Sequence, residues 1–147
     1  MSERMANNPN SSEFTVGILG AGAMGRGIAQ IIATGGMRVL LFDANDDALE
    51  AGRDFAERMI LRAGEKGTIT DEEAQAAVAR LSVATQLSDL ANSDLVIEAV
   101  IEDLKIKRKV FLELEEIVAE GCILATNTSS LSVAAIAAAL KYPGRFA

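Results

Sequence analysis

Three glycines carry the clearest chemical pattern, because they stand at the spacing Gly20-x-Gly22-x-x-Gly25 between an apolar run and a helix-like stretch. In that context the first glycine permits a tight turn, the second lets the backbone approach a pyrophosphate, and the third lets a helix pack closely on a strand. The N–H groups that open the helix would then face the anion. The segment predicts a dinucleotide-binding loop that includes Ala23 and Met24, although core packing is the simplest role for Met24.

The acid that follows the second apolar run indicates which dinucleotide binds. Asp43 comes directly after residues 37–42, and a carboxylate there can accept hydrogen bonds from the hydroxyls of an adenosine ribose. Its charge would repel a 2′-phosphate, so the sequence favours NAD over NADP as the cofactor. Two alternatives stay open: Asp43 could simply be an acid at the start of a helix, and Arg26 could lie in solvent or near the pyrophosphate.

Two charged residues follow a later apolar run, residues 94–100. Ligands of open parallel sheets bind beyond the carboxyl ends of the strands, so Glu102 and Lys107 are candidates for the site. They could form an ion pair beside the cofactor. They could equally be the charged start of a solvated helix.

Hydroxyl and amide side chains gather just after the apolar run 122–124, and the segment 126–130 is a second candidate for the site. By the same rule they would lie at the carboxyl edge of the sheet. Ser129 could instead cap the helix that follows, although Ser130 or Ser132 is the better candidate for that cap.

Apolar runs and helical periodicity alternate along the chain, which predicts an α/β fold with a Rossmann-type doubly wound parallel sheet. The crossover after the second strand is longer than a parallel pair requires, so we expect a helical-hairpin extension there. One NAD-binding domain is expected over residues 13–147, after a disordered polar segment, residues 1–12. The expected strands are residues 14–19, 37–42, 82–85, 94–100 and 122–126, and 145–147 resembles the start of another.

Local signals predict where several helices begin and end. Asn45 and Thr70 are expected N-caps, since each precedes acidic residues and a stretch with helical spacing. A helix is expected over about residues 103–120, with Gly121 as its C′ residue. Another is expected over residues 132–140.

The composition limits the partners of the chain. It has 147 residues, half of them hydrophobic, and a net charge of −7, so nucleic-acid binding is not expected. No stretch approaches the ~20 apolar residues of a membrane helix. With one cysteine and no histidine, the chain cannot form a structural zinc site, and no metal is expected. We expect a buried Cys122 thiol and a reducing, cytoplasmic setting.

Taken together, four stretches resemble the NAD-binding domain of the 3-hydroxyacyl-CoA dehydrogenases: GAGAMGRGIAQ, LLFDAN, DLVIEAVIEDLKIK and LATNTSSLSV. The last two are much more specific than the glycine pattern, and the resemblance runs from about Phe14 to Ala147. It implies oxidation of the 3-hydroxyl of a 3-hydroxyacyl-CoA to a ketone, with hydride passing to NAD. The acyl chain stays open, with 3-hydroxybutyryl-CoA and 3-hydroxyadipyl-CoA as candidates.

The resemblance also implies residue roles. Asp43 would bind the adenosine ribose, and Ala99 would give NAD a backbone contact. Glu102 and Lys107 match residues that line the nicotinamide ribose. Two further matches concern the substrate: Ser129, with Asn127 close by, would contact its oxygen and the cofactor, and Lys66 would approach CoA or be a solvated loop lysine.

One departure from the family is plain. The catalytic base of the family is a histidine shortly after the segment that matches RFA, and this chain has no histidine. The C-terminal helical domain, which completes the substrate pocket and usually the homodimer, is also expected to be absent. The chain would then be the cofactor half of a longer enzyme. A stand-alone NAD-binding or sensing domain, or another Rossmann dehydrogenase, is the alternative.

Overall fold

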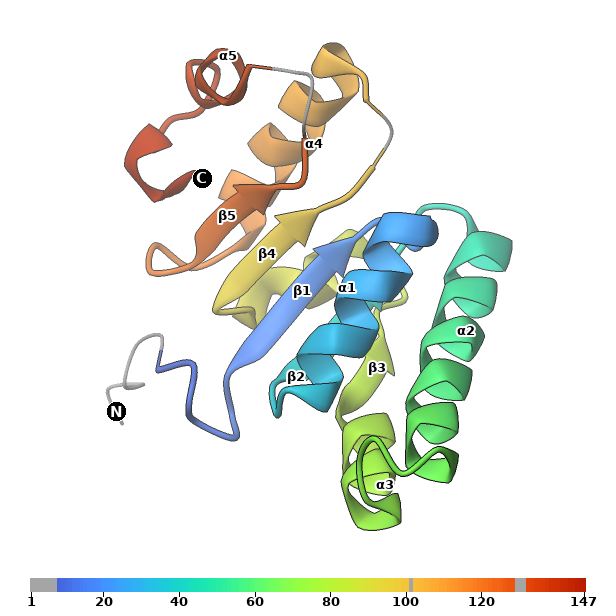
Figure 1. Ribbon diagram of the computed structural model, residues 1–147. Helices are drawn as coiled ribbons and strands as arrows, with labels where there is room; N and C mark the ends of the chain where they lie inside the picture. The colour runs from blue at the N-terminus through green and yellow to red at the C-terminus, as the bar shows by residue number, and fades with distance from the viewer. Residues whose placement is uncertain (1–7, 101, 129–131) are drawn as a thin grey trace.

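The structure, a computed structural model, describes residues 8–100, 102–128 and 132–147 (Figure 1). Its five-stranded sheet is parallel at every pairing, with the strand order β3-β2-β1-β4-β5. This order confirms the predicted doubly wound Rossmann sheet. The strands are β1 (Thr15–Leu19), β2 (Arg38–Phe42), β3 (Leu81–Val83), β4 (Leu95–Glu98) and β5 (Ile123–Thr126).

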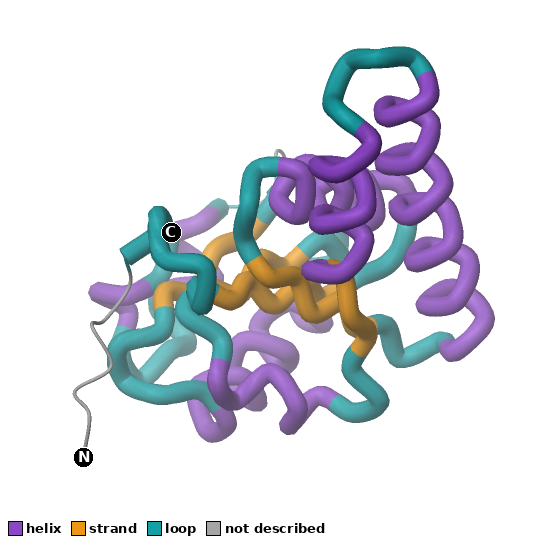
Figure 2. The backbone as a smooth tube through the Cα atoms, turned by 90° about the horizontal axis from the view of Figure 1, so that it is seen from below, coloured by secondary structure: helices purple, strands orange, loops and turns teal. Residues whose placement is uncertain are grey.

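Helices lie on both faces of the sheet, so the molecule has three layers (Figure 2). One face is covered by α1, α2 and α3, and the other by η1, α4 and α5. The helices are α1 (Ala23–Thr34), α2 (Asp46–Glu65), α3 (Asp71–Arg80), α4 (Leu104–Ile117) and α5 (Val133–Ala137), with the 3₁₀ helices η1 (Leu87–Asn92) and η2 (Pro143–Arg145). No helix in the described ranges is long and apolar enough to cross a membrane.

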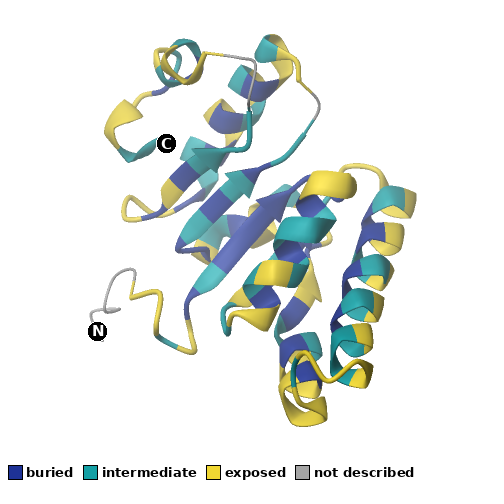
Figure 3. Cartoon of the chain, viewed as in Figure 1, coloured by how far each residue is buried: buried dark blue, intermediate teal, exposed yellow. Residues whose placement is uncertain are grey.

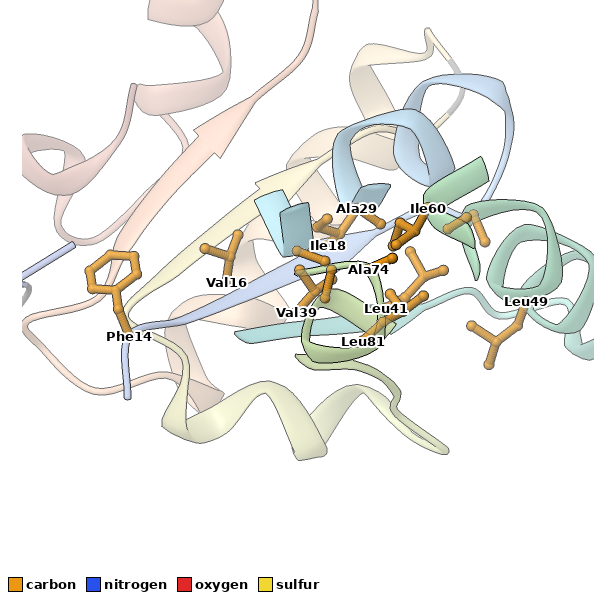
Figure 4. Packing of buried hydrophobic residues seen from close by; sticks show 14 residues of the cluster. Phe14, Val16, Ile18, Ala29, Val39, Leu41, Leu49, Ile60, Ala74 and Leu81 are labelled. Atoms are coloured by element: carbon orange, nitrogen blue, oxygen red, sulfur yellow. The ribbon is translucent and has the colours of Figure 1, made fainter. Parts of the chain in front are cut away.

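Each face of the sheet has its own apolar core (Figure 3). In the first core, Val16 and Ile18 of β1 pack against small residues of α1 such as Ala29 (Figure 4). The alanine lets the helix lie close to the strands, which is why a chain poor in aromatic residues can still fill this layer. The second core contains the buried Phe111 of α4, whose ring meets Phe146 edge-on at 4.7 Å.

The expected helical hairpin is formed by α2 and α3, which pack against each other beside α1 (Figure 1). Both helices begin at the predicted caps. The Asn45 side chain accepts a hydrogen bond from the Ala48 N–H at 3.0 Å, and Thr70 Oγ1 accepts one from the Glu73 N–H at 3.0 Å.

The predicted end of α4 is wrong. The helix stops at Ile117, with Val118 in an extended conformation, rather than reaching Gly121. Val118 is buried in the second core, and that packing turns the chain out of the helix before the glycine. At the far edge of the sheet, Phe146 forms a parallel bridge with Leu124, as expected for the start of another strand.

Between β3 and β4, Asp89 holds the turn that leads into η1. Its carboxylate accepts hydrogen bonds from the Thr85 N–H, the Thr85 hydroxyl and the Gln86 N–H. These bonds, first among them that from the Thr85 backbone, hold the pKa of Asp89 below its usual value because they stabilise the charged form.

Close backbone contacts fix the glycine loop between β1 and α1. Gly20 has a φ of 110°, a conformation that other residues rarely adopt. A Cβ on Gly25 would collide with the Gly20 carbonyl, whereas a Cβ on Gly22 would meet no protein atom within 4 Å. Gly25 is therefore required by packing, and Gly22 is not.

These contacts predict that the same substitution has a large effect on stability at Gly25 and almost none at Gly22. Gly25→Ala should lower the free energy of unfolding by about 3 kcal/mol, because the added methyl must push α1 away from the loop. Gly22→Ala should leave it nearly unchanged. Urea denaturation followed by circular dichroism measures both variants. Equal stability of the two variants would contradict the packing role of Gly25.

Candidate cofactor-binding site

The carboxyl edge of the sheet brings most of the predicted site residues together (Figure 1). The glycine loop follows β1, Asp43 follows β2, and Ala99 follows β4. Strand order reverses between β1 and β4, which is where ligands of doubly wound sheets bind. The Ala99 N–H donates to the Leu19 carbonyl at 2.8 Å, so its backbone lies directly against the loop.

The start of α1 has the properties of an anion site. Gly22 is its N-cap residue, no side chain caps it, and its first turn holds no acid. By contrast, a side chain caps each of α2, α3, α4 and α5. The first N–H groups of α1 and the positive end of its dipole therefore suit an anionic ligand.

Asp43 joins the end of β2 to the glycine loop. One carboxylate oxygen accepts from the Ala21 N–H at 2.9 Å, and the other accepts from the Asn45 N–H at 2.8 Å. The side chain is therefore fixed in orientation beside the loop. Each oxygen has a second lone pair, with which it can accept from a ligand hydroxyl.

Two residues of the loop segment depart from the simplest expectations. Met24 is 58% exposed and is not part of the core. Arg26 is half-buried, and its guanidinium lies 4.0 Å from the centre of the Phe55 ring on α2, which is a cation–π contact. Arg26 thus connects the start of α1 to α2. Neither of the two roles that the sequence left open for Arg26, in solvent or near the pyrophosphate, included this contact.

Beyond β4 the structure confirms the predicted ion pair and adds a member to it. Lys107 Nζ lies 3.0 Å from Glu102 Oε1, and it lies 2.6 Å from Oε2 of Glu98. Lys107 and Glu98 are fully buried, whereas the Glu102 side chain is 41% exposed. The alternative of a solvated helix start is therefore wrong for Lys107.

Threonine hydroxyls connect this charged cluster to the loop after β5. Thr126 Oγ1 donates to the second oxygen of Glu98 at 2.6 Å, and Thr128 Oγ1 donates to Glu102 Oε2 at 2.7 Å. The Asn127 N–H donates to the Glu98 carbonyl at 2.9 Å. The segments after β4 and β5 are thereby held side by side.

Glu98 belongs to a segment that was expected at the site, but no role was predicted for its side chain, although a signal was present. An acid inside the otherwise apolar stretch LVIEAV must be paired if the strand is buried. The partner comes from the next helix and could not be identified from spacing within the strand.

Two predicted site residues are not placed with the others. Ser129 lies outside the described residues. Lys66 is exposed at the C-terminal end of α2, while Asp43 precedes the start of that helix. Gly52 of α2 meets Ala21 of the glycine loop, and Lys66 lies about 21 Å further along the helix, so it is far from the loop.

The chain matches the family model described as the NAD-binding domain of 3-hydroxyacyl-CoA dehydrogenase over residues 15–147. It is 40% identical over 131 residues to a 3-hydroxybutyryl-CoA dehydrogenase of Mycobacterium tuberculosis. It is also 40% identical over 133 residues to a 3-hydroxyadipyl-CoA dehydrogenase of Escherichia coli. These alignments cover 88% and 90% of this chain, but 46% and 28% of the relatives.

Solved structures agree with the sequence matches. The chain is similar to a 3-hydroxybutyryl-CoA dehydrogenase of Escherichia coli, with a TM-score of 0.87 and 39% identity, over 91% of this chain and 28% of that one. An (S)-3-hydroxybutyryl-CoA dehydrogenase of Ralstonia eutropha gives a TM-score of 0.84 at 39% identity, over 90% of this chain and 47% of that one. The chain thus spans less than half the length of these proteins.

The position of Asp43 predicts a preference for NADH over NADPH. The preference should shrink by about tenfold in Asp43→Asn, the equivalent of about 1.4 kcal/mol, because the charge that repels a 2′-phosphate is lost. Asparagine keeps one oxygen that can accept from the Ala21 N–H. Titration calorimetry with both dinucleotides measures the ratio, and an unchanged ratio would exclude this role of Asp43.

The open space at Gly22 predicts that a larger side chain there affects the ligand and not the fold. Gly22→Val should abolish detectable NADH binding, because its branched side chain blocks the approach of a pyrophosphate to the backbone. Its unfolding midpoint should stay close to that of the unsubstituted chain. A folded variant that binds NADH at the original affinity would contradict the loop assignment.

Proposed function

Because the chain belongs to the 3-hydroxyacyl-CoA dehydrogenase family, whose NAD-binding domain it matches over residues 15–147, we propose that it is the cofactor-binding portion of such an enzyme. The reaction would transfer hydride between the 3-hydroxyl of a 3-hydroxyacyl-CoA and NAD. The observation that carries the proposal is the uncapped start of α1 beside Gly22, at the point where the strand order reverses.

The residues at the carboxyl edge fit a dinucleotide. The start of α1 offers N–H groups to a pyrophosphate, and an ideal Cβ on Gly22 meets only open space, so a ligand can reach the backbone there. We assign the hydroxyls of the adenosine ribose to the fixed carboxylate of Asp43. We assign the nicotinamide half to the other side of the reversal, where Ala99, Asn127 and Glu102 lie.

Bound NAD would supply the hydride acceptor, and the residues of this chain would position the two reactants. Ser129 and Asn127 follow β5, and we propose that they hold the substrate oxygen near the cofactor. Lys66, at the tip of the hairpin, is exposed and positively charged, and we propose that it contacts a phosphate of CoA.

The relatives differ in the acyl group of the substrate that their names give, although they share the type of reaction. Relatives of similar identity carry the names 3-hydroxybutyryl-CoA dehydrogenase and 3-hydroxyadipyl-CoA dehydrogenase, and we propose these two acyl chains as the candidate substrates. We further propose a cytoplasmic protein, in keeping with its buried free thiol, Cys122. Homodimers would form only in a chain that also carries the substrate domain.

The 147-residue chain should bind NADH but should not oxidise 3-hydroxyacyl-CoA measurably. Removal of the hydroxyl proton needs a positioned base, which typically contributes about 10²–10⁴-fold to the rate, and the chain has no histidine for this role. An assay of NADH absorbance with 3-hydroxybutyryl-CoA and 3-hydroxyadipyl-CoA, at high protein concentration, tests this.

The control is a full-length relative of established activity, assayed beside the chain under the same conditions. A turnover close to that of the relative would contradict the proposal and would assign the base to a residue of this chain. Glu102 would then be the first to replace. Failure to bind NADH by calorimetry would contradict the cofactor assignment itself.

A further inference from the structure

The buried carboxylate of Glu98 has all its close contacts within the protein. One oxygen accepts from Lys107 Nζ at 2.6 Å and from the Val100 N–H at 2.7 Å, and the other accepts from Thr126 Oγ1 at 2.6 Å. The residue is 0% exposed, so it cannot reach a ligand. Any effect of Glu98 on a ligand must pass through its partners.

Lys107 is occupied in the same way. Its ammonium group has three donors, and they face Glu98 Oε2 at 2.6 Å, Glu102 Oε1 at 3.0 Å and the Val100 carbonyl at 3.5 Å. Its side chain is 1% exposed. Lys107 can therefore affect a ligand only through Glu102, because each of its three donors already faces an acceptor and its side chain is buried.

Glu102 is the member of the cluster that reaches the surface. Its side chain is 41% exposed, one oxygen faces Lys107, and the other accepts from Thr128. These two contacts fix the plane of the carboxylate, and its exposure lets a ligand hydroxyl approach it. The orientation of the surface carboxylate thus depends on the position of the buried lysine.

Stability alone is a poor explanation for this pair. The cost of taking two charges out of water offsets much of their attraction, and replacing a buried pair by neutral groups of similar volume is often neutral or stabilising. Orientation of an exposed group is a role that neutral replacements do not supply.

We propose that Glu98 is a positioning residue, which holds Lys107 so that the exposed Glu102 carboxylate is aimed at the nicotinamide half of the bound dinucleotide. The inference rests on the proposed function, since it requires that NAD lies along this edge. In the proposed function, other residues bind the adenosine half and the pyrophosphate. The affinity for a ligand that has only these parts should therefore not depend on Glu98.

The test compares two ligands on the 147-residue chain. Glu98→Gln should weaken NADH binding by about tenfold, the effect of losing one hydrogen bond to a charged group, while ADP binding stays unchanged. Calorimetry measures both affinities. The fluorescence of bound NADH reports how the nicotinamide is held, and the chain has no tryptophan to interfere.

Glu113→Gln is the matched control, since it removes the same charge from an exposed position on α4. It should change neither affinity. A double-variant cycle then tests the route: when Glu102 is already Gln, adding Glu98→Gln should cost little more NADH affinity, because the two residues act in series.

Glu98→Gln leaves a buried lysine with one charged partner and can impair folding. Glu98→Gln/Lys107→Met removes both charges at similar volume, and it should fold, bind ADP normally and show the same loss for NADH. An unchanged NADH affinity in this variant would overturn the proposal, as would equal losses for ADP and NADH or additive losses in the cycle. A chain that binds ADP but not NADH would overturn the function and this inference together.

Discussion

The close backbone packing around the glycine loop is the constraint on which the rest of the site depends. Gly25 lies against the Gly20 carbonyl, and Gly20 lies against the backbone of Ala99. On the outer side, a Cβ on Gly52 would collide with the Ala21 carbonyl, so α2 is also in direct contact with the loop. Because no methyl group fits at these points, the loop fixes the spacing of β1, β4, α1 and α2 at once.

Much of the fold could be predicted from local patterns. The apolar runs and the glycine spacing give the parallel sheet, and the caps at Asn45 and Thr70 give the hairpin, because each signal involves residues close in sequence. The end of α4 could not be predicted in this way. Val118 leaves the helix because it packs in the second core, and that packing is a tertiary interaction, which overrides the terminating glycine further on.

The site residues can be divided in the same way, into those that local patterns predict and those that depend on tertiary contacts. The loop, Asp43 and the pairing of Glu102 with Lys107 follow from motif spacing within single segments. Glu98 was missed because its partners come from α4 and from the neighbouring strand β5, which only the folded sheet brings together. The contact of Arg26 with Phe55 was missed for the same reason, since it joins two helices that pack side by side.

The charges along the carboxyl edge alternate in a way that matches a dinucleotide. Asp43 is a carboxylate at one end, the uncapped start of α1 is a partial positive charge in the middle, and the Glu98–Lys107–Glu102 cluster carries one net negative charge at the other end. Ribose hydroxyls can donate to carboxylates, and a pyrophosphate can accept from the helix start. The order of the charges therefore suits the proposed placement of ribose, pyrophosphate and ribose in sequence, and a further phosphate at the Asp43 end would not suit it.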